Sequence, residues 1–222
     1  MELTDAMRST FACRHYLPKP VPDRVFYEAV DAARFGPQGG NRQPVRFVIV
    51  RDDEKKRALG ELYKVAWRRF LDARPSGPSS ETPVAPSRSD FAESFGRCPA
   101  IVVVCANLAA THPTDLELDR ISIVAGASIY PLVQNFCLAM RNLGVATTLT
   151  TLLVEQEPAV KSLLGIPEDW VTACHLAAGY PADGFPTKLR RLPVEELAFV
   201  DTFGIALAAE DAGRSGGGYL TR

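Results

Sequence analysis

The sequence contains few residues of the kinds that hold metals or act as nucleophiles. It has 3 histidines and 5 cysteines among 222 residues, and neither type occurs at the short spacings of a metal site or a redox dithiol. It also lacks a Ser/His/Asp or Cys/His arrangement for nucleophilic catalysis. Metal and nucleophilic catalysis are therefore not expected, and the scattered cysteines indicate reduced core residues of a cytoplasmic protein.

Long hydrophobic runs and an excess of either charge are absent as well. The longest apolar run, residues 100–106, is too short to span a bilayer, and residues 1–10 lack the pattern of a signal peptide. With 25 Lys and Arg against 26 Asp and Glu, bulk charge favours neither nucleic acid nor a membrane as a partner. We expect a soluble protein located in the cytoplasm.

Hydrophobic periodicity predicts alternating helices and strands. Helical spacing covers residues 23–35, 52–72, 121–143 and 155–164, with a kink or break near Tyr130 because Pro131 follows it. Short apolar runs predict strands at 46–50, 100–104, 145–153 and 171–178. Residues 73–90 are rich in Pro and Ser and are predicted to form a mobile excursion, either a lid or a tolerated insertion. This order favours an α/β or α+β domain of three layers.

A glycine-rich loop, Gly36-Pro37-Gln38-Gly39-Gly40-Asn41-Arg42-Gln43-Pro44, lies between the first predicted helix and strand. Glycines allow a backbone to approach a flat ligand, and the amides of Asn41 and Gln43 can both donate and accept hydrogen bonds. A planar heterocycle with carbonyls and ring nitrogens would fit such a loop. An ordinary turn is the alternative interpretation.

Two short basic clusters are candidates for binding a phosphate. The first contains Arg8, Ser9, Thr10 and Arg14, and the second contains Lys188, Arg190 and Arg191. The planar fork of arginine suits phosphate oxygens, although two solvated basic turns would have the same composition. Trp67 and His175 are both interpreted as packing residues, His175 as a core histidine with its hydrogen bonds satisfied.

The order of several motifs resembles that of the FMN-dependent nitroreductases. The motifs begin with Arg14-His15-Tyr16, Lys19-Pro20-Val21-Pro22 and the Gly39–Pro44 loop. They continue with Ser128-Ile129-Tyr130-Pro131, Leu143-Gly144-Val145, Thr147-Thr148-Leu149-Thr150-Thr151, Leu164-Gly165-Ile166-Pro167, Gly179-Tyr180-Pro181 and Arg190-Arg191-Leu192-Pro193. Each motif is degenerate by itself, but the ordered set covers residues 4–203.

The resemblance implies an α+β fold, a three-layer α/β/α sandwich with a central, mostly antiparallel sheet. It implies one domain over residues 1–222, with the excursion at 73–90 and a C-terminal arm from about residue 200. It also implies a homodimer that binds FMN at the interface and uses NAD(P)H as co-substrate. The residues implied to contact FMN are Arg8, Ser9, Thr10, Arg14, Pro37, Gln38, Gly39, Asn41, Gln43, Ser128, Leu149, Thr150, Thr151, Lys188, Arg190 and Arg191, with residues 128–130 supplied by the partner subunit.

In such a protein the flavin carries the chemistry, so no side chain is expected to be catalytic. Hydride would pass from NAD(P)H through FMN to an electrophilic small molecule such as a nitroaromatic or a quinone. Two alternatives stay open: a specialised flavin-dependent dehydrogenase, oxidase or reduced-flavin-using enzyme of a biosynthetic pathway, and a flavin-binding module without catalysis. Gln38 and Val45 depart from the serine and the aromatic residue that are common at these positions.

Overall fold

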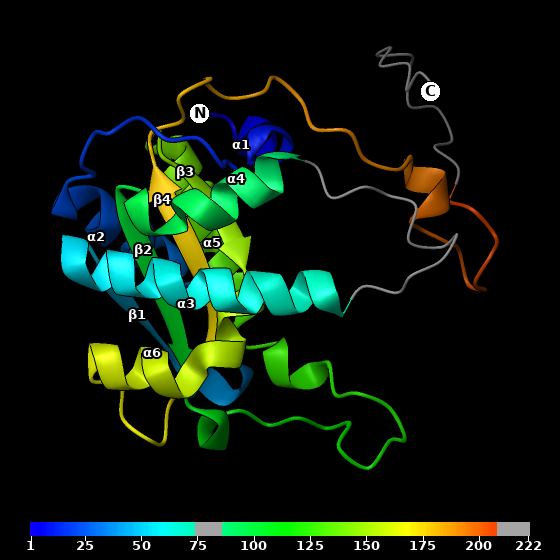
Figure 1. Cartoon of the computed structure of the whole chain (residues 1–222). Coiled ribbons are helices and arrows are strands. Elements are labelled where there is room, and N and C mark those ends of the chain that lie inside the picture. Colours follow the sequence, from blue (N-terminus) through cyan, green and yellow to red (C-terminus); the bar gives the residue numbers. More distant parts are fainter. Residues whose placement is uncertain (74–85, 208–222) are drawn as a thin grey trace. The chain divides into compact units, whose positions relative to one another are not determined.

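The computed structural model describes residues 1–73 and 86–207. It divides the chain into two units, Met1–Thr187 and Lys188–Arg222, and each is described by itself. The first unit contains the helices and strands labelled in Figure 1: α1 (Leu3–Ser9), α2 (Asp23–Ala33), β1 (Val45–Val50), α3 (Asp53–Asp72), α4 (Pro86–Ser94), β2 (Ala100–Ala106), α5 (Tyr130–Asn142), β3 (Ala146–Thr150), α6 (Glu157–Leu164) and β4 (Val171–Gly179).

Four strands form one sheet in the order β1-β2-β4-β3, and each neighbouring pair is antiparallel. β2 is buried along its whole length, as its unbroken apolar sequence predicts for a central strand. β1 and β3 are the two edges. The N-terminal segment touches the β3 edge through a parallel bridge between Ala12 and Thr147.

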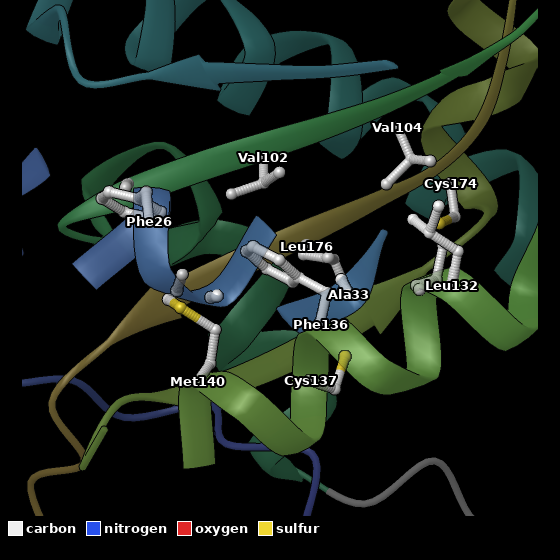
Figure 2. Packing of buried hydrophobic residues seen from close by; sticks show 14 of the residues in the cluster. Phe26, Ala33, Val102, Val104, Leu132, Phe136, Cys137, Met140, Cys174 and Leu176 are labelled. Carbon is white, nitrogen blue, oxygen red and sulfur yellow. The ribbon is translucent and has the colours of Figure 1, made fainter. Parts of the chain in front are cut away.

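Helices cover both faces of this sheet. On one face α2 and α5 pack against alternate residues of β2 and β4, and Figure 2 shows Phe136 and Met140 of α5 directed towards the strands that carry Val102 and Leu176. On the other face α3, α4 and α6 pack against the residues between them, such as Ile101 and Val103. Fully burying a Phe, Leu or Met side chain stabilises a fold by roughly 1.5–3 kcal/mol. The predicted three-layer α+β architecture with an antiparallel sheet is confirmed.

The predicted helix over residues 121–143 is wrong in its first part. α5 begins at Tyr130, and only a short 3-10 turn, Val124–Gly126, lies before it. Pro131 lies in the first turn of α5, where its missing N–H is no loss. The predicted break near Tyr130 is confirmed, and it is the start of the helix. The apolar residues Ile121 and Ile123 that extended the helical pattern are 88% and 75% exposed.

Two other boundaries also differ from the prediction. The last residues of the predicted excursion are helical, because α4 begins at Pro86 and buries Phe91 and Ala92 against α3. Residues 74–85 lie outside the described part, so the excursion's role as a lid is not tested. The third strand ends at Thr150, and a 3-10 turn, Leu152–Gln156, follows it.

The second unit contains a 3-10 turn, Val194–Glu196, and an antiparallel bridge between Phe199 and Ala206. Residues 208–222, which include most of the predicted C-terminal arm, lie outside the described residues. One domain over the whole chain therefore stays a prediction. Within the described ranges, the structure contains no helix that is both long and apolar enough to cross a membrane.

Candidate functional site

The edge strand β3 carries the first group of predicted site residues. The N–H of Cys13 donates to the carbonyl oxygen of Thr147 over 3.2 Å, which attaches the N-terminal segment to this edge. The hydroxyl of Tyr16 donates to the carbonyl oxygen of Cys13 over 2.7 Å, and Thr148 donates to the same oxygen. These bonds hold Arg14, which lies between the two anchored residues, beside the strand.

Arg14 lines a cavity of about 200 Å³ together with Leu149 and Thr150 of β3. Its side chain is half-buried, and among the described residues it has no hydrogen-bond or ion-pair partner. Leu149 is 45% exposed, although the threonines on either side of it are buried. An unpaired cation and an outward-facing apolar side chain on a free strand edge form a surface suited to a flat, polar-edged ligand.

Aromatic side chains of α3 and α4 form the other wall of this cavity: Tyr63, Trp67, Phe70 and Phe91, with Arg88 beside them. Trp67 stacks on Phe70 with ring centroids 5.4 Å apart, and Phe91 contacts Tyr63 edge to face at 6.0 Å. Thr150 Oγ1 donates to the hydroxyl of Tyr63 over 3.3 Å, which links this wall to β3. Burial raises the pKa of Tyr63, so its phenol stays protonated at neutral pH.

The glycine-rich loop lies before β1, at the opposite edge of the sheet. Gly36 packs so closely on α5 that an added Cβ would lie 2.8 Å from the Cα of Leu132, which places the loop beside the start of α5. There the N–H of Gly39 donates to Ser128 Oγ over 3.0 Å. Gly40, Asn41 and Gln43 all have φ between 50° and 60°. Left-handed backbone at a residue such as Gln43 costs stability and is concentrated at functional sites.

A buried carboxylate orders the segment that leads to Ser128. Asp115 is 3% exposed and accepts hydrogen bonds from Arg120 Nη1 and Ser122 Oγ at 2.7 Å. It also accepts from the backbone N–H groups of residues 123 and 124 at 3.0 and 3.4 Å. The hydrogen bond from Ser122 is the largest of the effects that hold the pKa of Asp115 well below its usual range. The segment that precedes Ser128 is thus held in place by Asp115.

The cysteines offer no alternative chemistry. All five are buried and free, as predicted from their apolar surroundings. Burial raises the pKa of Cys13 and Cys105 to about 11 and of Cys98 and Cys174 to about 12, so these thiols are not ionised at neutral pH. Within the described ranges, no group of three His, Cys, Asp or Glu residues could hold a metal ion.

Comparison with known proteins decides which fold this is. The model of the family described as "Nitroreductase family" matches residues 7–180. The chain belongs to the nitroreductase family. The matched residues include both Arg14 and the glycine-rich loop.

Nitroreductase-family relatives cover most of this chain at low identity. An NADH dehydrogenase of Thermus thermophilus is 25% identical over 195 residues, which cover 83% of this chain and 88% of that protein. A nitrobenzene nitroreductase of Ectopseudomonas oleovorans is 21% identical over 221 residues, which cover 90% and 96%. A crystal structure of iodotyrosine deiodinase bound to FMN and 3-iodo-L-tyrosine has a TM-score of 0.71 at 21% identity, covering 87% of this chain and 96% of that one. This structural likeness shows that the nitroreductase fold is shared.

The predicted nitroreductase site residues fall into separate groups in the structure. Arg14, Leu149 and Thr150 share the β3 cavity, with the exposed Thr151 next in the chain. Gly39 meets Ser128, while Gln38 and Gln43 line a second cavity of about 620 Å³ along β1. Pro37 and Asn41 are exposed in the same loop.

The basic clusters are less simply placed. Arg8 is exposed in the last turn of α1, and Thr10 Oγ1 donates to the carbonyl oxygen of residue 6 over 2.7 Å. Ser9 is buried; its hydroxyl donates to the backbone and accepts from Arg141 Nε over 2.9 Å. Lys188, Arg190 and Arg191 are exposed residues of the second unit. Their roles at a phosphate stay predictions.

Sequence reasoning missed the α3 and α4 wall. Tyr63 and Phe70 had no signal beyond helical periodicity, and Trp67 was interpreted as a packing residue. The structure shows that Trp67 is buried and also lines the cavity, so it does both. Arg88 lay in the Pro/Ser-rich stretch, where no site was expected. His175 is fully buried as predicted, but neither of its ring nitrogens has a hydrogen-bond partner in the described structure, so the satisfied-histidine interpretation is wrong.

Proposed function

We propose that this protein transfers hydride from NAD(P)H through bound FMN to an electrophilic small molecule, such as a nitroaromatic or a quinone. As a member of the nitroreductase family the chain is an FMN-dependent oxidoreductase; the donor and the acceptor are the proposed part. The observation that carries the proposal is the pairing of the unpartnered Arg14 with the exposed Leu149 at the β3 edge. The five buried, free cysteines support a cytoplasmic location.

The residues at the β3 edge fit a flavin. A flavin ring has two faces without hydrogen-bonding groups and a pyrimidine edge with carbonyls and nitrogens. Leu149 offers an apolar contact to a face, while Arg14 and the hydroxyl group of the exposed Thr151 offer donors to the edge. When bound, FMN supplies the hydride-accepting and hydride-donating chemistry.

Arg14 has the electrostatic task in this arrangement. A cation near the pyrimidine edge favours the state in which that edge is negatively charged, and partial burial strengthens the interaction relative to water. Because Arg14 has no competing carboxylate among the described residues, its charge is available to a ligand. Arg8, Thr10, Lys188, Arg190 and Arg191 are proposed to contact the ribityl phosphate.

We propose that each site takes its two halves from two copies of the chain. The glycine-rich loop precedes β1 and the Arg14 group lies at β3, and these are opposite edges of the sheet. The contact between Gly39 and Ser128 keeps the loop and the start of α5 in one group. Gln38, Asn41, Gln43 and Ser128 would then approach the flavin held by Arg14 and Leu149 of the partner. The free β1 edge and its 620 Å³ cavity offer further surface for a homodimer.

Subunit mixing tests this proposal. Arg14→Gln and Asn41→Ala each damage one half of the site. When the two variants are unfolded and refolded together, a shared site restores flavin binding to about a quarter of the sites in a random dimer population. Sedimentation measures the dimer and flavin absorbance measures occupancy. No recovery on mixing, or a flavin-loaded monomer, would contradict a site made by two copies.

A further inference from the structure

We propose that the electron acceptor carries an anionic group, such as a carboxylate on an aromatic ring, and that Arg88 of α4 binds it. This inference rests on the proposed function and names the class of its acceptor. Arg88 lines the β3 cavity on the wall formed by α3 and α4, across from Leu149. No step of flavin binding proposed above uses that wall.

The charge around this cavity is positive. Arg14 and Arg88 line it, and none of the described residues in its lining is an aspartate or a glutamate. A neighbouring cavity of about 280 Å³ shares Arg14 and Phe91 with the first and adds His15 and Arg97, and its lining within residues 1–73 and 86–207 contains no acidic residue. Two acidic residues of adjoining segments are paired with other groups: Glu93 lies 3.5 Å from Lys64 Nζ, and Asp183 lies 3.5 Å from His15 Nδ1.

Arg88 is itself unengaged. In the described part of the chain it has no hydrogen-bond, ion-pair or ring partner, whereas Arg97 donates to the carbonyl oxygen of Glu93 over 3.0 Å. An exposed arginine beside a cavity, with no internal partner, keeps all of its guanidinium donors for a ligand. Its planar fork matches a carboxylate with two parallel hydrogen bonds.

The aromatic side chains of α3 and α4 indicate that the uncharged part of the acceptor is an aromatic ring. Trp67 and Phe70 are stacked on each other, and Tyr63 stacks on Phe95 at 4.4 Å, so their rings are held in place before a ligand arrives. The aromatic side chains of α3 and α4 line one wall of the cavity, so they suit a planar aromatic ring placed beside the flavin. Together, the wall and the arginine select a small aromatic anion.

A matched pair of acceptors tests the inference. 4-Nitrobenzoate and 4-nitrobenzamide have the same shape and reducible group but differ by one charge. The ratio of their kcat/KM values is measured for the wild type, Arg88→Gln, Arg88→Lys and the control Arg57→Gln. Arg57 is an exposed residue of α3 that lines neither of the two cavities, so its removal changes net charge equally.

We expect Arg88→Gln to lower the benzoate-to-benzamide ratio about tenfold, in line with the loss of one charged hydrogen-bonding group. Arg88→Lys should keep most of the preference, and Arg57→Gln should keep all of it. A ratio in Arg88→Gln within about twofold of the wild type, in an enzyme that still reduces both compounds, would overturn the inference and leave the proposed function intact.

A binding measurement distinguishes failure of the proposed function from failure of the inference about Arg88. Calorimetric titration of the purified protein with benzoate and with benzamide needs no turnover. If neither nitro compound is reduced, the proposed function fails, yet a preference for benzoate that disappears in Arg88→Gln would still support the anionic site. Equal binding of benzoate to the wild type and Arg88→Gln would overturn it.

Discussion

Replacing Arg14 by Gln should weaken flavin binding without weakening the fold. Arg14 is half-buried beside Leu149 and Thr150 and has no hydrogen-bond or ion-pair partner among the described residues. A hydrogen bond to a charged group contributes about 1.5–3 kcal/mol, and every 1.4 kcal/mol is a factor of ten, so the Kd for FMN should rise about 10- to 150-fold. Gln keeps most of the side chain's length and can still donate one bond, which favours the lower part of that range.

The stability of the apoprotein provides the internal control. Because no internal bond is removed, the free energy of unfolding in urea should change by less than about 0.5 kcal/mol. Arg57→Gln is the matched control variant: it removes the same charge from an exposed residue of α3, outside the β3 cavity. Fluorescence titration of apoprotein with FMN gives the Kd. A change of less than twofold in Arg14→Gln, or an equal loss in both variants, would refute the assignment of Arg14 to the cofactor.

Three further predictions concern groups around the site. Burial lowers the pKa of His175 from 6.5 to about 4, so the unfolded chain binds a proton at a higher pH than the folded protein does. The free energy of unfolding should therefore fall by up to about 3 kcal/mol as the pH drops from 6.5 to 4. Urea unfolding at several pH values measures this fall; His175→Leu should flatten it, and an unchanged slope in that variant would contradict the prediction. Gly36→Ala should lower the free energy of unfolding by about 1–3 kcal/mol and reduce flavin retention, because the added Cβ forces the glycine-rich loop away from Leu132. A variant with full stability and full flavin occupancy would show that the close approach is not needed. Asp115→Asn should lower the melting temperature at pH 7 and make the backbone N–H groups of residues 123 and 124 exchange faster with solvent. The wild type should lose its higher melting temperature below about pH 4, where the carboxyl of the unfolded chain takes up a proton. Equal melting temperatures of the two proteins at pH 7 would refute the anchoring role of Asp115.

Most of the fold could be predicted because its elements have strong periodic patterns. α2, α3 and α6 follow helical spacing with clear ends, and the buried run of β2 has no polar interruption. The error at residues 121–129 came from the same rule, since Ile121, Ala125 and Ile129 have the four-residue spacing of a helix face although Ile121 is exposed. The segment is fixed instead by the carboxylate of Asp115, and an Asp five to nine residues before the groups it bonds leaves no periodic signal.

The site was only half predictable. Motif order predicted Arg14, the glycine-rich loop and the β3 threonines as site residues, because these lie in compact stretches of sequence. The wall of Tyr63, Trp67 and Arg88 meets β3 only through the packing of α3 and α4 on the sheet, across more than sixty residues of chain. The separation of the two site halves onto opposite sheet edges also required the strand order, which no local pattern specifies.

The visible absorption spectrum of the freshly purified protein, repeated without oxygen after addition of NADH and then NADPH, tests the central claim most directly. We expect a bound-flavin spectrum that bleaches with at least one of the two nucleotides and recovers when a nitroaromatic or quinone is added. Bound flavin that stays oxidised with both nucleotides would contradict NAD(P)H as the donor and favour a specialised flavin enzyme. A colourless protein that takes up no added FMN would contradict the cofactor itself.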